Sequence, residues 1–318
     1  MLKNDVITIG DAMITFNPAS KGPMRYVHSF EKKVGGAELN FAIGCARLGL
    51  KIGIISRTGN DEFGRHILNF IRGEGIDISE VKLMDEYPTS INFKEILEDG
   101  SGRTFYYRHP SPTNELTLDS ISEEFIRNSK VLHITGVFAA INPKNIAILE
   151  HAAKLAKKNN VKVSFDPNIR LKLWSLEDAR EGLLKLLPYV DFVFSGEQEA
   201  EWLFGPKTLE QYIDTYKEYG AEHVIIKRGD EGSVGYFNGE IINARAKKPR
   251  KVVDTVGAGD GFNAGYIYSY LQGSSLKESL EFANTVGSMV VSVSGDNEGL
   301  PYLEDVLIAT GKSVFIER

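Results

Sequence analysis

The chain has 318 residues, with 37 lysines and arginines against 43 aspartates and glutamates, so its formal net charge is −6. This mild acidity argues against a nucleic-acid partner, which calls for a basic face, and 42% hydrophobic residues argue against disorder. The single cysteine, Cys45, excludes a disulfide framework and a multi-thiolate metal site.

We expect no targeting signal at the beginning of the chain. Residues 1–10 are interrupted by Asp5 and continue directly into a strand pattern, with no hydrophobic signal region or cleavage site. No apolar run approaches the ~20 residues that span a bilayer. We therefore expect a cytosolic protein with no membrane partner.

Short apolar runs alternate with helical patterns along most of the chain. Alternation of this kind indicates βαβ units around a parallel sheet, and hence an α/β fold. The predicted strands lie at 6–9, 52–55, 131–134, 161–165, 192–194 and 224–226, and the predicted helices at 40–48, 63–71, 145–158, 176–187, 262–271 and 279–286.

Two segments of the N-terminal third, about 12–34 and 88–112, break this rhythm. They are strand-like, and polar residues alternate along them (Asn92, Lys94; then Arg103, Phe105, Tyr107). Such alternation favours half-exposed antiparallel strands over a buried parallel sheet. We expect the two segments to form one small sheet, a plausible lid over the mouth of the α/β domain.

The segment 254–262 is the most informative of the chain. Gly257, Ala258 and Gly259 lie between the strand-like residues 251–253 and the predicted helix 262–271, where backbone N–H groups converge into an anion cradle. Asp260 at the helix start would repel a bound phosphate, but it suits a general base aimed at an attacking hydroxyl. An ordinary glycine-rich turn with Asp260 as N-cap is the structural alternative.

Two motifs resemble the signatures of the ribokinase-like (pfkB-type) sugar kinases: residues 254–260, and residues 34–42 with Gly35, Gly36 and Asn40. The resemblance extends over essentially the whole chain. It implies one domain over residues 1–318 with a Rossmann-like ribokinase fold, in which a mostly parallel sheet flanked by helices carries a small β-sheet lid. It also implies ATP with Mg²⁺ but no all-protein metal site, Asp260 as base, and the Gly257, Ala258 and Gly259 amides as the phosphoryl cradle.

Three further segments (104–108, 164–174 and 295–301) resemble those of 2-keto-3-deoxygluconate kinases. Arg108 and Arg170 suit the carboxylate of a sugar acid, and Tyr106 shares a strand face with Arg108. With Asp11, Gly35, Gly36, Asn40 and Asp260, they form the expected substrate site. The alternatives are a solvated Arg108, a fructokinase, and a catalytically silent sugar-binding sensor.

The same resemblance predicts the nucleotide side of the site and an assembly. The residues expected there are Asn168, Ser195, Lys227, Gly229, Gly232, Gly257, Gly259 and Asn284. The exposed edge of the small sheet invites pairing with a second subunit, so we expect a homo-oligomer.

Overall fold

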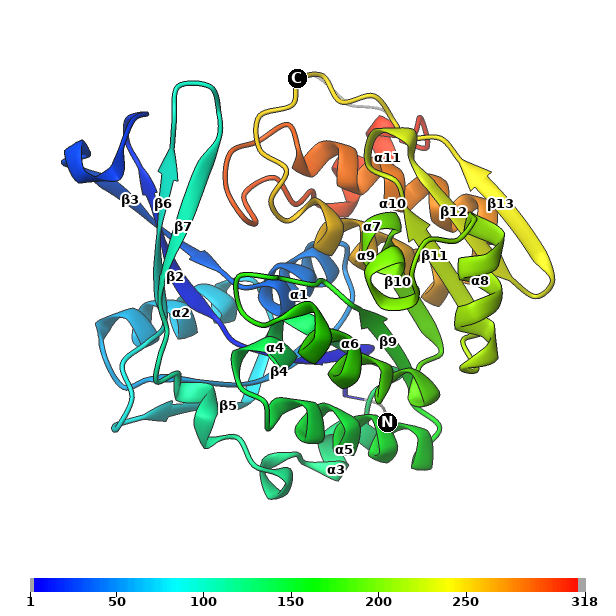
Figure 1. Cartoon of the computed structure of the whole chain (residues 1–318), viewed down its shortest axis with the longest axis horizontal. Coiled ribbons are helices and arrows are strands. Elements are labelled where there is room, and N and C mark those ends of the chain that lie inside the picture. Colours follow the sequence, from blue (N-terminus) through cyan, green and yellow to red (C-terminus); the bar gives the residue numbers. More distant parts are fainter. Residues whose placement is uncertain (1–2, 314–318) are drawn as a thin grey trace.

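The computed structural model describes residues 3–313 and builds them around two sheets (Figure 1). In this described part the large sheet has nine strands in the order β13-β12-β11-β10-β9-β8-β1-β4-β5, and all of them run in one direction except β12, which is antiparallel to both of its neighbours. Its strands are β1 (Val6–Ile9), β4 (Ile52–Gly59), β5 (Asp77–Met84), β8 (Val131–Thr135), β9 (Lys162–Asp166), β10 (Phe192–Gly196), β11 (His223–Lys227), β12 (Ser233–Phe237) and β13 (Glu240–Ala244).

Helices cover both faces of the large sheet, because its strands are apolar on both sides. Ile7 and Ile9 belong to one hydrophobic core and Val6 to the other, as the alternation of a strand requires. The first core includes α3 (Glu123–Arg127), α4 (Gly136–Ile141), α5 (Asn145–Lys158), α6 (Leu176–Leu184), α7 (Glu197–Phe204) and α8 (Leu209–Glu218); the second includes α1 (Ala37–Arg47), α2 (Glu62–Gly73), α9 (Ala258–Leu271), α10 (Leu276–Val290) and α11 (Leu303–Ala309).

The order of the strands fixes where a ligand can bind. From β1 the chain proceeds to β4 and β5 on one side, and later to β8 and its successors on the other. The strand order therefore reverses between β1 and β8, and in open α/β sheets ligands bind at such a switch point, outside the carboxyl ends of the strands.

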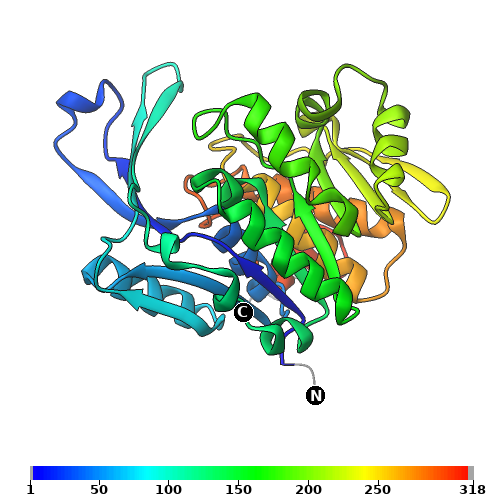
Figure 2. The ribbon, with the colours of Figure 1, turned by 60° about the horizontal axis from the view of Figure 1, so that its bottom comes forward.

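The small sheet stands to one side of this edge in both ribbon views (Figures 1 and 2). It contains β2 (Met13–Pro18), β3 (Phe30–Gly35), β6 (Ile91–Ile96) and β7 (Gly102–Tyr107), in the order β3-β2-β6-β7. The expected pairing of the two N-terminal segments is confirmed. The expected antiparallel pairing holds within each segment, in β2–β3 and β6–β7, whereas the β2–β6 pair that joins the two segments is parallel.

Two local predictions around the glycine motif also differ from the structure. Residues 251–253 form no strand, because Val252 and Val253 lie on the surface, 62% and 47% exposed, without a neighbouring strand to pair with. Helix α9 begins at Ala258 rather than at residue 262, so Asp260 lies inside its first turn.

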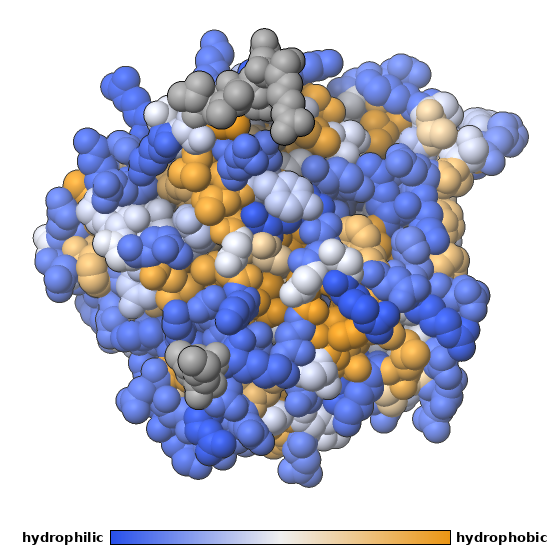
Figure 3. Space-filling model, turned by 180° about the vertical axis from the view of Figure 1, so that it is seen from behind, coloured by the Kyte–Doolittle hydropathy of each residue, from blue (hydrophilic) through white to orange (hydrophobic). Residues whose placement is uncertain are grey.

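Within residues 3–313, no helix is long and apolar enough to cross a membrane. Seen from behind, the molecule shows apolar side chains toward the middle of the face and mostly hydrophilic ones around its outline (Figure 3).

Candidate active site

Two adjoining cavities open at the carboxyl ends of the parallel strands. The small-sheet cavity, about 540 Å³, lies between the small sheet and the large one; the α10 cavity, about 460 Å³, lies beside α9 and α10. Lys227 and Gly259 border both. Among the predicted residues, the small-sheet cavity is lined by Gly36, Asn40, Tyr106, Arg108, Asn168, Arg170, Lys227, Gly257, Gly259 and Asp260, and the α10 cavity by Lys227, Gly229, Gly232, Ala258, Gly259 and Asn284.

Asp260 lies where the two motifs of the sequence meet. It is the third residue of α9 and is only 8% exposed. Asn40, from the other motif, donates its amide to Asp260 Oδ2 at 2.9 Å, and Asn168 donates to Oδ1 at 3.5 Å. Asn168 has a left-handed backbone, with φ of 37°, which is sparsely populated outside glycine and is typical of functional sites.

Burial raises the pKa of Asp260 to about 7. The hydrogen bond from Asn40 opposes this shift, the charge of Asp166 adds to it, and the cations Arg170 and Lys227 lower the pKa again. A carboxylate with a pKa close to the pH of its surroundings is well suited to accept a proton, so Asp260 has the position and the acidity of a general base.

Lys227 marks the junction of the two cavities. Its ammonium lies 2.7 Å from Asp166 Oδ2, which also accepts a 2.6 Å hydrogen bond from Asn263. Although burial acts to raise it, this ammonium holds the pKa of Asp166 below its usual value. Asp166 thus holds the Lys227 ammonium at the border of the two cavities.

The two glycines of the cradle have different roles. Gly257 has a φ of 78°, and a side chain on it would collide with the carbonyl oxygen of Asp296. At Gly259 an added Cβ would meet only Lys227 Nζ, at 3.6 Å. The first amides of a helix have no acceptor within the helix. Gly257 therefore shapes the turn, whereas Gly259 leaves space in front of free N–H groups.

Helix α1 is fixed beneath the small-sheet cavity by two features. Gly36, with φ of 134°, lies so close to the Asp11 carbonyl that no side chain would fit. Glu38 is fully buried and accepts hydrogen bonds from Thr135 Oγ1 and from the Phe138 amide. These contacts place Asn40, one turn further along the helix, against Asp260.

Both predicted arginines line the small-sheet cavity, but Arg108 is buried and paired whereas Arg170 is exposed. The Arg108 guanidinium forms a 2.7 Å ion pair with Asp11, and both side chains are buried. Its ring neighbour is Tyr106, 5.6 Å from the guanidinium carbon, and its Nε has no partner among the described residues. Arg170 is exposed and forms no ion pair with a described residue. Asp11 and Gly35 lie behind the wall of the cavity rather than in it.

The α10 cavity is mainly apolar, with Val252, Phe262 and Val291 in its wall. Asn284 borders it, yet its amide already donates to Ser233 Oγ and to the Ala244 carbonyl, each at 3.1 Å. An apolar slot that leads to a glycine cradle and an ammonium group suits a flat base followed by phosphates.

Two residues predicted for the nucleotide side lie elsewhere. Asn168 lines the small-sheet cavity, because the turn after β9 directs its amide to Asp260. Ser195 is fully buried at the end of β10, borders neither cavity, and donates its hydroxyl to the Gly196 carbonyl.

The site also contains residues that sequence reasoning had not assigned to it. Lys94, Thr104 and Asp296 line the small-sheet cavity. The alternation of side chains along a strand would have identified Lys94, because it places this side chain on the same face of β6 as Asn92, which also lines the cavity.

Comparison with known proteins agrees with this geometry. Residues 3–303 match the pfkB family of carbohydrate kinases. The chain belongs to that family. It is 35% identical to the 2-dehydro-3-deoxygluconokinase of Bacillus subtilis (95% of this chain, 94% of the relative) and 30% identical to the 5-dehydro-2-deoxygluconokinase of Clostridium perfringens (96% and 92%).

The fold of this pfkB kinase is also found in solved structures. A putative ribokinase II from E. coli, in complex with ATP and Mg²⁺, superimposes with a TM-score of 0.90 at 26% identity, covering 98% of this chain and all of the other. The expected ribokinase fold, a large mostly parallel sheet with a smaller separate one, is thereby confirmed.

Proposed function

We propose that this pfkB kinase transfers the γ-phosphoryl group of ATP to the 6-hydroxyl of 2-keto-3-deoxygluconate (2-dehydro-3-deoxygluconate). The observation that carries the proposal is the position of Asp260, a buried carboxylate that lines the polar cavity directly after Gly259, a residue that borders both the polar and the apolar cavity. The sequence similarity to a 2-dehydro-3-deoxygluconokinase and the two arginines in the polar cavity support the choice of substrate.

In this mechanism the adenine lies in the α10 cavity, and the phosphates reach the cradle at Gly259. The sugar occupies the small-sheet cavity with its 6-hydroxyl at Asp260, which takes the proton as the oxygen attacks the γ-phosphorus. The bond from that phosphorus to the β–γ bridging oxygen breaks, and ADP is the leaving group. Lys227 and the first amides of α9 stabilise the charge on the phosphoryl oxygens. The amide of Asn40 holds the Asp260 carboxylate in line.

The carboxylate of the sugar acid must lose water when the small sheet closes as a lid, so it needs charged donors in exchange. Arg170 is free to bind it directly. Arg108 is paired with Asp11 through Nη2, but its Nε has no partner among the described residues. Tyr106 lies beside the guanidinium. We assign the acid group to these three residues.

The residues present also fit a magnesium ion that is held mainly by phosphate and water. Glu199 accepts hydrogen bonds from the Gly196 and Ile169 amides, and Glu197 pairs with Arg228, so neither carboxylate offers a vacant inner site. When bound with ATP, Mg²⁺ supplies charge neutralisation on the phosphates.

An ADP-release assay with a panel of sugars tests the proposal. The panel contains 2-keto-3-deoxygluconate, its isomer 5-dehydro-2-deoxygluconate, fructose and gluconate. We expect the highest kcat/KM for 2-keto-3-deoxygluconate, and ¹³C–³¹P coupling in the product should identify the phosphorylated carbon. A preference for fructose would instead indicate a fructokinase. Tight sugar binding without turnover would indicate a catalytically silent sugar-binding sensor.

We also propose that the kinase is a homo-oligomer joined through the small sheet. Strands β3 and β7 are its edges and have outer backbone groups with no strand beside them in the described chain. Light scattering after size exclusion would measure the mass, and a monomer at all concentrations would contradict the proposal.

A further inference from the structure

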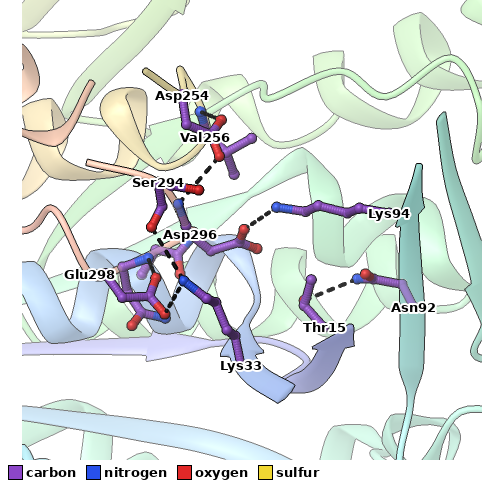
Figure 4. Close-up of polar contacts among 12 residues, drawn as sticks. Thr15, Lys33, Asn92, Lys94, Asp254, Val256, Ser294, Asp296 and Glu298 are labelled. Carbon is purple, nitrogen blue, oxygen red and sulfur yellow. Dashed lines mark hydrogen bonds and ion pairs between the residues drawn. The ribbon is translucent and has the colours of Figure 1, made fainter. Parts of the chain in front are cut away.

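Lys94 reaches across the small-sheet cavity from one wall to the other (Figure 4). It projects from β6, and its ammonium pairs with the carboxylate of Asp296, in the segment between α10 and α11. Both side chains line the cavity and are nearly buried, 14% and 11% exposed. The pair therefore crosses the space that the sugar would occupy.

The pair leaves hydrogen-bonding capacity unused. An ammonium group has three donors, and among the described residues Asp296 Oδ1 is the single acceptor for Lys94. Asp296 Oδ2 has no donor within the same described part of the chain. Within the pair, the ammonium thus keeps two donors, and the carboxylate one oxygen, that no described residue engages.

The small sheet presents one polar face to the cavity. The β6–β7 register places Lys94 opposite Thr104 and Asn92 opposite Tyr106, and all four line the cavity. Asn92 donates its amide to Thr15 Oγ1, at 3.2 Å (Figure 4). It also donates to the sulfur of Met13. Lys94 is the charged group among these four residues.

We propose that Lys94 is a specificity-determining residue that binds a hydroxyl group of the sugar, while Asp296 accepts the proton of that hydroxyl. A neutral hydroxyl both donates and accepts, which matches this pair of groups. A carboxylate would be repelled by Asp296, so the acid group of the substrate binds at the arginines instead. The inference rests on the proposed function, because it assumes a sugar in this cavity.

A purely mechanical role, holding the small sheet down, is the competing explanation. Lys33 provides a matched control, because it too extends from the small sheet to the same segment. Its Nζ lies 3.3 Å from both the Ser294 carbonyl and Glu298 Oε1, but it does not line the cavity (Figure 4). A tether role predicts similar defects for the two lysines, whereas substrate binding predicts a defect at Lys94 alone.

The test compares Lys94→Met and Lys33→Met in the ADP-release assay, using whichever panel sugar the wild-type enzyme turns over best. We expect Lys94→Met to raise the KM for the sugar about 10- to 100-fold, the loss typical of a hydrogen bond to a charged group, with the KM for ATP unchanged. Lys33→Met should change either value by about twofold at most.

Equal increases for the two variants, or an unchanged sugar KM in Lys94→Met, would overturn the inference. Thermal unfolding checks that each variant is folded. If Lys94→Met is not, Lys94→Gln keeps a polar end group on a side chain one atom shorter and without the charge, and should still raise the sugar KM. A wild-type enzyme that prefers fructose would refute the proposed substrate but not the role of Lys94, because fructose also carries hydroxyl groups.

Discussion

Replacing Gly259 with alanine should stabilise the protein and yet inactivate it. The backbone at Gly259 is an ordinary helical one, and the new Cβ would meet only Lys227 Nζ, at 3.6 Å, which is normal van der Waals contact. Glycine in a helix costs about 0.5–1 kcal/mol relative to alanine, so the free energy of unfolding should rise by up to that amount. The methyl group, however, would occupy the border of the two cavities.

We expect kcat to fall about 100-fold, since a displacement of about 1 Å between reacting groups can cost that much. Urea unfolding and the ADP-release assay measure the two effects separately. Gly257→Ala is the matched control: its left-handed backbone and the Asp296 carbonyl predict a loss of stability of more than about 1 kcal/mol. A Gly259→Ala enzyme that is less stable than the wild type, or that keeps its kcat, would refute the reasoning.

Three further predictions concern the charged groups of the site. Asp260→Asn should lower kcat by about 10²- to 10⁴-fold while calorimetry shows nearly unchanged sugar binding; a normal kcat would exclude Asp260 as the base. In the wild type, kcat/KM should fall as the pH drops through about 7, because Asp260 then becomes protonated. Arg170→Ala should move this acidic limb to higher pH, because it removes a cation that lowers the pKa of Asp260. A kcat/KM profile that is flat from pH 6 to 8 would contradict this prediction. Arg108→Ala should destabilise the fold by about 3–5 kcal/mol in urea, because it leaves Asp11 buried without a partner, whereas Arg170→Ala should have little effect on stability.

The sequence pattern predicts the alternating part of the fold well. The helix at 145–158 has the predicted ends, and β1, β8, β9, β10 and β11 lie within one or two residues of their apolar runs. The strand predicted at 52–55 extends four residues further, to Gly59, and β5 was not predicted. The sequence pattern predicts the wrong element where an apolar run is exposed, and it misses a helix start that has no apolar periodicity. Val252 and Val253 look like a strand but are exposed, and α9 begins with Ala258, Gly259 and Asp260, which have no apolar periodicity to reveal a helix.

The sequence identifies individual residues of the site, but it does not show which of them contact one another. Asn40 and Asp260 are both identifiable from their motifs, yet the hydrogen bond between them joins positions 220 residues apart. The motifs likewise identify Arg108 without showing that Asp11 already neutralises it. Such partners depend on how the strands are ordered, which periodicity alone does not determine.

The division of the site between two stretches of chain has a consequence for divergence within the family. The small sheet comes from residues before 108, whereas the wall of the α10 cavity comes from residues after 226. Exchange of the small sheet between two homologues could therefore give a chimera with a new acceptor preference and an unaltered donor. The new small sheet would also have to fit the segment around Asp296, because Lys94 of β6 pairs with Asp296 there.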